Sequence, residues 1–231
     1  MPALPLKSSN INLEHYQKDA PLNTHQRSRY SFIKRLLSQI PKIGKGLDYG
    51  CGLGDITHHM SSYFESIIGV DVTPQRVEWA NAHYAPLQFH VCDPKTLDFP
   101  DGSFDTVLSS VVINWADDPE SYLQNIRKVL VIGGHLVILV RGTDVIRTCL
   151  RSLRGGVNKS SSGFKNISPE LMTKMLSADF KVIAIDCLYE SFSEIPHTPQ
   201  NLIVEFLKLP FKLFNVPRHA EYYGILAQKV S

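Results

Sequence analysis

The chain has 231 residues, of which 43% are hydrophobic and 20% are charged, and its formal net charge is +2. This length suits one sizeable α/β domain, and we expect a single domain because no stretch has the composition of a linker. The near-neutral charge gives no reason to expect nucleic-acid binding. The four cysteines form no CxxC pair, so neither a zinc site nor a disulfide framework is predicted.

Residues 1–19 lack the basic start and apolar core of a signal peptide, and no apolar run reaches about 18 residues. We therefore expect a cytoplasmic protein without stable membrane insertion. After this polar arm, apolar residues at helical spacing predict a helix over 26–40 that ends before Pro41.

Helices and strands are predicted to alternate through the rest of the chain. Two helices are predicted after residue pairs typical of an N-cap followed by proline, Thr73-Pro74 and Asp118-Pro119. The other helices are predicted over 55–64, 144–153 and 169–178, and the strands over 46–49, 66–71, 87–92, 104–110, 135–140, 180–188 and 222–230. Gly133-Gly134 is expected to turn the chain into the fifth strand.

This alternation predicts an α/β fold: a Rossmann-like, doubly wound, mostly parallel seven-stranded sheet with helices on both faces. We expect the last strand to be antiparallel, because only residues 189–221 separate it from the strand before it. The single domain, 1–231, is expected to comprise an N-terminal arm and helix (1–40), a ligand-binding core (41–141) and a substrate-side half (142–231).

The glycine-rich segment 47–54, LDYGCGLG, is the most informative part of the sequence. A strand that ends in glycines before a helix brings backbone N–H groups close to a ligand. Its spacing is G-x-G-x-G, whereas a dinucleotide site needs G-x-G-x-x-G. Asp48, at the tip of the strand, also suits an ammonium group better than a phosphate.

Two more acidic residues end the next two predicted strands. Asp71 follows Gly54 by about 17 residues, close to the spacing at which a carboxylate binds ribose hydroxyls. Asp93 ends the third strand, and parallel strands bind ligands at their carboxyl ends. A ligand with an amine, a ribose and an amino-bearing base would match these two residues and Asp48. Asp105, at the start of the fourth strand, is expected to be structural.

With these segments in this order, the sequence resembles class I S-adenosylmethionine-dependent methyltransferases, and most closely the small-molecule branch that includes quinone-biosynthesis methyltransferases. The resemblance covers about residues 40–140, and it is carried by the segments 47–54, 68–71, 91–94, 99–105 and 129–138. It implies S-adenosylmethionine as the cofactor and in-line transfer of its methyl group to a small-molecule acceptor.

The resemblance also implies cofactor contacts at the positions that match the family. These are Asp48, Tyr49, Gly50, Cys51, Gly52 and Gly54 for the methionine part, Asp71 and Val72 for the ribose and adenine, Asp93 and Pro94 for the adenine, and Ser109 and Ser110 near the sulfonium.

The sequence departs from the family pattern at two places. Residues 131–134 read VIGG where relatives usually have Lys-Pro-Gly-Gly, and Asn114-Trp115 stands where many relatives carry a histidine. Because asparagine cannot act as a general base, we name no catalytic base. We name no metal ligand either. Asn114, Trp115 and Tyr16 are the candidate substrate contacts.

The apolar insertion 191–217 has three interpretations: a lid over an apolar substrate, a dimer contact, or a membrane-surface segment. We prefer the lid, and a homodimer remains an expectation. Two other functions also stay open. One is a non-catalytic S-adenosylmethionine-binding protein, and the less favoured one is a nicotinamide-dependent oxidoreductase.

Overall fold

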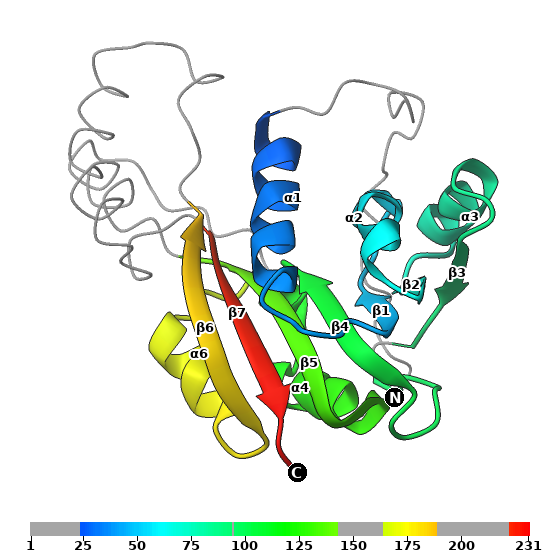
Figure 1. Ribbon diagram of the computed structural model, residues 1–231. Coiled ribbons are helices and arrows are strands. Elements are labelled where there is room, and N and C mark those ends of the chain that lie inside the picture. The colour runs from blue at the N-terminus through cyan, green and yellow to red at the C-terminus, as the bar shows by residue number, and fades with distance from the viewer. Residues whose placement is uncertain (1–23, 94, 143–163, 189–221) are drawn as a thin grey trace, which may run out of the picture.

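The computed structural model describes residues 24–93, 95–142, 164–188 and 222–231, which form one seven-stranded sheet flanked by helices (Figure 1). The strands are β1 (Lys45–Tyr49), β2 (Ser66–Asp71), β3 (Gln88–Val91), β4 (Phe104–Ser110), β5 (Leu130–Arg141), β6 (Phe180–Leu188) and β7 (Tyr222–Lys229). The α-helices are α1 (Thr24–Leu37), α2 (Asp55–Met60), α3 (Pro74–His83), α4 (Pro119–Val129) and α6 (Pro169–Leu176). Two short 3₁₀ helices are η2 (Ser61–Tyr63) and η3 (Ile113–Trp115).

The strand order is β3-β2-β1-β4-β5-β7-β6, and β7 alone runs antiparallel to both of its neighbours. The fold prediction, a Rossmann-like doubly wound sheet with an antiparallel last strand, is therefore confirmed. The order of the strands reverses between β1 and β4. In open sheets of this kind, ligands bind at that reversal, outside the carboxyl ends of the strands.

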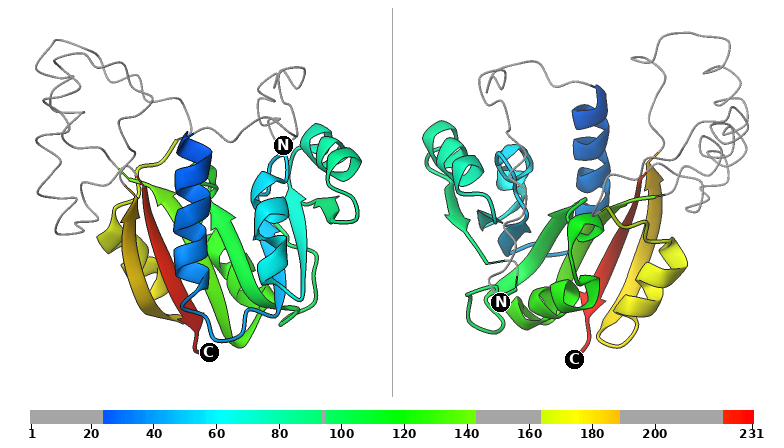
Figure 2. Two further views of the ribbon diagram at one scale, coloured as in Figure 1. Left: turned by 45° about the horizontal axis from the view of Figure 1, so that its top comes forward. Right: turned by 180° about the vertical axis from the view of Figure 1, so that it is seen from behind.

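Helices α1, α2 and α3 cover one face of the sheet, and α4 and α6 cover the other (Figures 1 and 2). Residues of strand β5 pack into the hydrophobic cores on both faces of the sheet. Leu136, Ile138 and Val140 belong to the core under α4 and α6, whereas Val137 and Leu139 belong to the core under α1. Because both faces are covered, residues 136–140 of this strand are all apolar and buried instead of alternating with polar residues.

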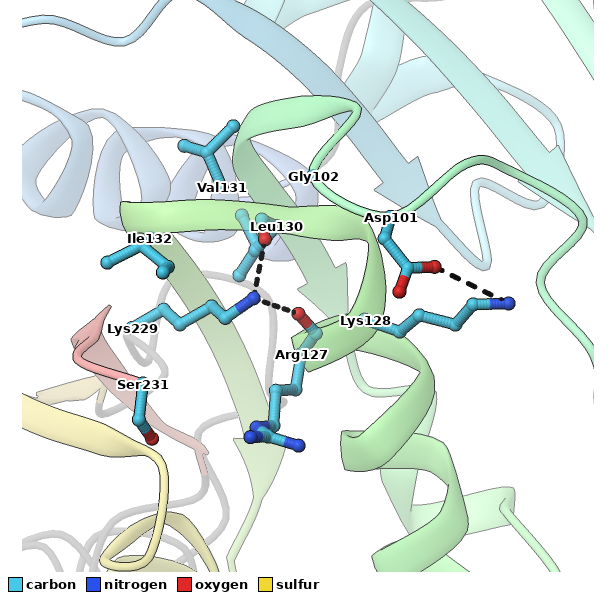
Figure 3. Close-up of a pocket in the computed structure, with 9 residues that line it drawn as sticks. All are labelled: Asp101, Gly102, Arg127, Lys128, Leu130, Val131, Ile132, Lys229 and Ser231. Atoms are coloured by element: carbon cyan, nitrogen blue, oxygen red, sulfur yellow. Dashed lines mark hydrogen bonds and ion pairs between the residues drawn. The ribbon is translucent and has the colours of Figure 1, made fainter.

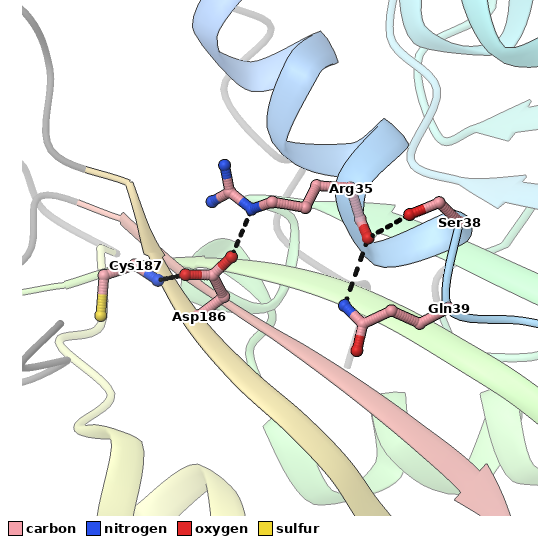
Figure 4. A network of polar contacts seen from close by, with 5 residues as sticks. All are labelled: Arg35, Ser38, Gln39, Asp186 and Cys187. Atoms are coloured by element: carbon pink, nitrogen blue, oxygen red, sulfur yellow. Dashed lines mark hydrogen bonds and ion pairs between the residues drawn. The ribbon is translucent and has the colours of Figure 1, made fainter.

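Helix α1 packs against the sheet with a fully apolar face, as its spacing predicted, but it ends at Leu37 and not at Ile40. The chain then makes tighter i→i+3 bonds, including Ile40 N to Leu37 O at 2.9 Å. Pro41 explains the early end, because a residue before proline avoids the helical conformation. Arg35 of α1 forms an ion pair with Asp186 of the edge strand β6, with 2.5 Å between Nε and Oδ2 (Figure 4).

Strand β5 begins at Leu130, five residues earlier than predicted. The prediction that Gly133-Gly134 turns the chain into this strand is therefore wrong. Leu130 already pairs with Phe104, and the register shifts before His135 pairs with Thr106. Gly133, with φ 81°, therefore lies in a bulge within the strand and not in a turn before it.

Other boundaries differ by a few residues. The predicted helix 55–64 is α2 followed by η2, and β3 is shorter than the predicted strand 87–92. The predicted helix 144–153, the insertion 191–217, Tyr16 and Pro94 lie outside the described residues.

Candidate functional site

The predicted site residues that the structure describes gather at the carboxyl edge of the parallel strands. Asp48 lies near the end of β1, Asp71 ends β2, and Asp93 follows β3. Ser109 and Ser110 end β4, on the other side of β1. The candidate site thus occupies the edge of the sheet where the strand order reverses.

The glycine turn after β1 is fixed to β2 by its backbone. The N–H groups of Gly50 and Cys51 both donate to Val70 O, at 2.8 and 2.9 Å. Gly50 has φ 86°, and a Cβ there would lie 2.2 Å from Val112 Cγ2, so a side chain is excluded. At Gly52, with φ 57°, a Cβ would meet no atom within 4 Å. The turn therefore leaves open space against its backbone, which a ligand could fill.

Asp48 is a buried carboxylate, with 1% of the residue exposed. It accepts a hydrogen bond from Thr57 Oγ1 of α2 at 2.6 Å. Burial, aided by the negative charge of Asp71, raises the pKa of Asp48 to about 7, although the bond from Thr57 opposes this shift. A ligand cation beside this carboxyl group would favour its ionised form, so the residue fits an ammonium group.

Asp71 ties the glycine turn to the start of α3. Its Oδ2 accepts from Gly52 N at 3.0 Å, and its Oδ1 accepts from Thr73 N at 2.9 Å. Arg76 Nη1 lies 3.9 Å from Oδ1. A carboxylate has about four acceptor positions, so Asp71 keeps the capacity to bind hydroxyl groups as well. Thr73 is the N-cap residue, as predicted, but its side chain makes no capping bond.

Asp93 and Val72 lie at the outer part of the edge, where both are exposed. Asp93 Oδ1 accepts from Lys95 N at 2.8 Å, which closes a local turn. Its exposed carboxylate retains acceptor capacity toward a ligand, and Val72 is an exposed apolar side chain that follows the neighbouring strand β2.

The two serines at the end of β4 have different surroundings. Ser109 is buried and its Oγ lies 2.9 Å from the hydroxyl of Tyr122, which in turn donates to Tyr49 O at 3.3 Å. The rings of Tyr49 and Tyr122 stack at 4.5 Å. Ser109 and Tyr49 therefore belong to a buried network that joins β1, β4 and α4.

Ser110 differs because its Oγ is shielded from solvent and has no hydrogen-bond partner among the described residues. The next residue, Val111, has φ 64°. A β-branched residue rarely adopts this left-handed conformation, and such strain is concentrated at functional sites. A buried hydroxyl without a protein partner can serve as a ligand contact. Both features make the end of β4 a candidate for ligand contact.

Asn114 and Trp115, in η3 after β4, are separated by the structure. Asn114 is fully buried, and its Nδ2 donates to the backbone oxygens of Arg141 (3.1 Å) and Lys165 (2.9 Å). Its Oδ1 accepts from Arg141 N at 2.9 Å. This placement favours a structural role for Asn114, whereas Trp115 is 52% exposed and free to meet a substrate.

Three further residues of this region were not singled out from the sequence. Thr57 holds Asp48, and Val112 packs against Gly50. Arg141 ends β5 at the same edge. Asp71 was selected because it lies at the carboxyl end of a predicted parallel strand, and the same reasoning would have selected Arg141. No sequence signal marks Thr57 or Val112.

A pocket of about 400 Å³ lies at the opposite, amino edge of the sheet (Figure 3). It is lined by Asp101, Gly102, Arg127, Lys128, Leu130, Val131, Ile132, Lys229 and Ser231. Lys229 Nζ donates to the backbone oxygens of Arg127 and Leu130, at 2.9 and 2.8 Å. None of the predicted site residues lines this pocket, so it is not the candidate site.

Over the described ranges, no three His, Cys, Asp or Glu side chains are grouped as metal ligands would be. The helices of these same ranges include none with both the length and the apolar character that a membrane span requires.

Residues 47–138 match a protein-family model described as a methyltransferase domain. Among curated proteins, the chain is 26% identical over 212 residues to the human mitochondrial ubiquinone biosynthesis O-methyltransferase. That alignment covers 81% of this chain and 58% of the relative. The chain is 24% identical over 191 residues to the zebrafish (Danio rerio) mitochondrial arginine-hydroxylase NDUFAF5, which covers 76% and 60%. The chain spans 58% and 60% of the length of these two relatives, and 34% of the length of the malonyl-[acyl-carrier protein] O-methyltransferase of Hahella chejuensis.

Solved structures share the fold at low sequence identity. A complex of the Haloferax volcanii Trm112 methyltransferase activator with a methyltransferase matches with a TM-score of 0.69 and 19% identity, covering 90% of this chain and 92% of the other. The Bradyrhizobium japonicum N-methyltransferase NodS, solved with S-adenosyl-L-homocysteine, matches with a TM-score of 0.63 and 16% identity, covering 90% and 89%.

Proposed function

We propose that this chain, which carries a class I S-adenosylmethionine-dependent methyltransferase domain, transfers the methyl group of its cofactor to a small-molecule acceptor. One observation carries the proposal: neighbouring parallel strands place Asp48, Asp71 and Asp93 around an open glycine turn at one edge of the sheet. These groups suit a ligand that combines an ammonium group, a ribose and an amino-bearing base.

The residues of this edge would each hold a different part of S-adenosylmethionine. Asp48 would bind the ammonium group, and its burial strengthens that interaction because little water competes. Asp71 would accept hydrogen bonds from the ribose hydroxyls, while Asp93, Pro94 and Val72 would contact the adenine. The backbone from Gly50 to Gly54 and the hydroxyl of Ser110 would border the methionine part.

When bound, this cofactor supplies a methyl group activated by a positively charged sulfur. The protein's part is then to align the acceptor with that group and to exclude water. A neutral amine can attack without first losing a proton, whereas an ammonium group, a phenol or an alcohol would have to lose one. We assign no catalytic base, since Asn114 at the family's histidine position is buried in backbone contacts.

A second candidate function is favoured by one relative. The arginine-hydroxylase NDUFAF5 covers 76% of this chain, so proteins of similar sequence carry a function other than methyl transfer. A protein that binds S-adenosylmethionine without methyl transfer is the corresponding alternative here. The nicotinamide alternative is weaker, because Asp48 would lie beside a pyrophosphate.

Transfer of radiolabelled methyl from S-adenosylmethionine to a panel of phenols, quinone precursors and amines tests the proposal. We expect label in at least one acceptor, and loss of that label with Asp71→Ala. Cofactor binding with no product over the panel would favour the binding protein. Absence of cofactor binding by the folded chain would contradict both functions.

The remaining proposals concern the whole protein. We propose that residues 1–231 form a single domain in the cytoplasm, although two of the relatives are mitochondrial by name. We also propose a homodimer that forms through the apolar insertion 191–217. Light scattering after size-exclusion chromatography should then give a molar mass twice that of the monomer.

A further inference from the structure

Beyond the cofactor residues, one cluster at the carboxyl edge has the chemistry of a separate binding surface. Trp115, in η3, meets the ring of Phe164 edge-on, with 5.1 Å between the centroids and 79° between the planes. The guanidinium carbon of Arg141 lies 5.6 Å from the centroid of the same ring. Phe164 therefore joins an exposed aromatic residue to a cation, and we call these three residues the Trp–Phe–Arg cluster.

The buried side chain of Asn114 holds the backbone next to these residues. Its side chain bonds to the backbone N and O of Arg141 and to the backbone O of Lys165, and its own backbone O accepts from Lys165 N at 2.7 Å. Asn114 is fully buried, so the backbone that carries the cluster is held by buried hydrogen bonds. A preorganised surface loses less entropy when it binds a ligand.

The positive charge of Arg141 is not paired with a carboxylate in the part of the chain that the structure describes. Arg141 is exposed and has no ion pair with a described carboxylate. By contrast, the nearby Lys165 is engaged, since its Nζ donates to the backbone oxygens of Ala116 and Asp117. Among the described residues of this surface, Arg141 is thus the cation that is available to a ligand.

We infer that the Trp–Phe–Arg cluster binds the methyl acceptor and selects a planar, apolar molecule that carries an anionic group. The apolar body would lie against Trp115 and Phe164, and a carboxylate or phosphate would pair with the planar guanidinium of Arg141. This inference rests on the proposed function and names its substrate class. The cluster adjoins the cofactor edge, because Val112, two residues before Asn114, packs against Gly50 of the glycine turn.

Fluorine NMR of the full chain tests the inference with three small probes: 4-fluorobenzoate, 4-fluorophenyl phosphate and the neutral 4-fluorobenzamide. Line broadening on titration reports binding, and the two anions distinguish a carboxylate from a phosphate preference. We expect at least one anion to bind about tenfold or more tightly than the amide. Arg141→Gln should remove that preference, and Trp115→Ala should weaken the anion and the amide alike.

Lys128→Gln is the matched control, because Lys128 is an exposed cation of the amino-edge pocket. It should leave the binding of all three probes unchanged. Equal binding of anions and amide, no binding by any probe, or loss in Lys128→Gln in place of Arg141→Gln would each overturn the inference.

Calorimetry with S-adenosylhomocysteine separates this inference from the proposed function. The Arg141→Gln and Trp115→Ala variants should bind it as the unchanged chain does, which also shows that they fold. If the unchanged chain does not bind it, the proposed function fails. The preference among the fluorinated probes is measured without cofactor and stands or fails by itself.

Discussion

At the amino edge of the sheet, charged side chains pair with other groups of the protein, whereas at the carboxyl edge the Ser110 hydroxyl has no hydrogen-bond partner among the described residues. Lys229 donates to two backbone oxygens at the end of α4, and Lys128 pairs with Asp101 at 3.8 Å. Arg127 Nε lies 2.7 Å from Asp179, an ion pair without the alignment of a hydrogen bond.

The carboxyl edge holds a buried hydroxyl without a partner at Ser110, a strained backbone at Val111, and a buried carboxyl at Asp48 that resists ionisation. Each of these costs stability in the free protein. This difference favours the carboxyl edge as the ligand-binding edge and supports a structural role for the charged groups of the amino edge. The pocket in Figure 3, despite its volume, is lined by none of the candidate site residues.

The largest expected effect comes from Asp71→Ala. We expect affinity for S-adenosylmethionine to fall about 100-fold or more, since two hydrogen bonds from ribose hydroxyls to a charged group contribute about 1.5–3 kcal/mol each. Isothermal titration calorimetry measures it, with circular dichroism to establish folding. Asp71→Asn, which keeps one acceptor oxygen, should lose less. Unchanged affinity in folded Asp71→Ala would remove this residue from the site.

A second effect should appear in the pH dependence of cofactor binding. Because the pKa of Asp48 is about 7 in the free protein, binding of an ammonium group should draw the residue into its ionised form and release a proton. Affinity should therefore rise about tenfold from pH 6 to pH 8. Asp48→Asn should flatten this rise. Equal slopes in the two proteins would contradict the assignment of Asp48 to the ammonium group.

The same residue should affect stability with the opposite sign. Its pKa is higher in the folded state than the usual value of 3.8, so the folded state binds more protons between about pH 4 and pH 7. The free energy of unfolding of the free protein should fall as the pH rises through that window. Urea unfolding at pH 5 and pH 8 should show a smaller difference for Asp48→Asn, and an unchanged difference would contradict the raised pKa.

A third effect should separate the two edges. Lys229→Met removes the donor to the backbone oxygens of Arg127 and Leu130 while keeping an apolar stem. We expect the free energy of unfolding to fall by about 1–3 kcal/mol. Cofactor affinity should stay within about twofold. Weaker cofactor binding in a stably folded variant would mean that the amino edge takes part in the site.

The smallest effect is expected for Arg35→Gln, which breaks the ion pair with Asp186 in Figure 4. Since 53% of the Arg35 side chain is exposed, we expect a loss of at most about 1 kcal/mol in urea unfolding. The loss should shrink further in high salt. A larger, salt-independent loss would show that this contact contributes through packing.

Most of the fold could be predicted from the sequence, because hydrophobic periodicity and proline and glycine positions are local signals. The chain order of the described strands and α-helices and the apolar face of α1 follow from such signals, and both are confirmed. The bulge in β5 could not be predicted, because it depends on Leu130 pairing with Phe104, a contact between distant residues.

The candidate site divides in the same way. Asp48 and Asp71 could be selected because strand ends at one edge must lie together. The burial of Asn114, and its bonds to Arg141 and Lys165, could not be read from the sequence, because these partners lie 27 and 51 residues away. The conformation of Val111 likewise depends on tertiary structure.

The most direct test is a calorimetric titration of the full chain with S-adenosylmethionine and S-adenosylhomocysteine, with NADH and NADPH as controls. We predict micromolar binding of both sulfur compounds and no binding of the nicotinamide nucleotides. Binding of a nicotinamide nucleotide, or a folded protein that binds none of the four, would contradict a cofactor site built on Asp48, Asp71 and the glycine turn.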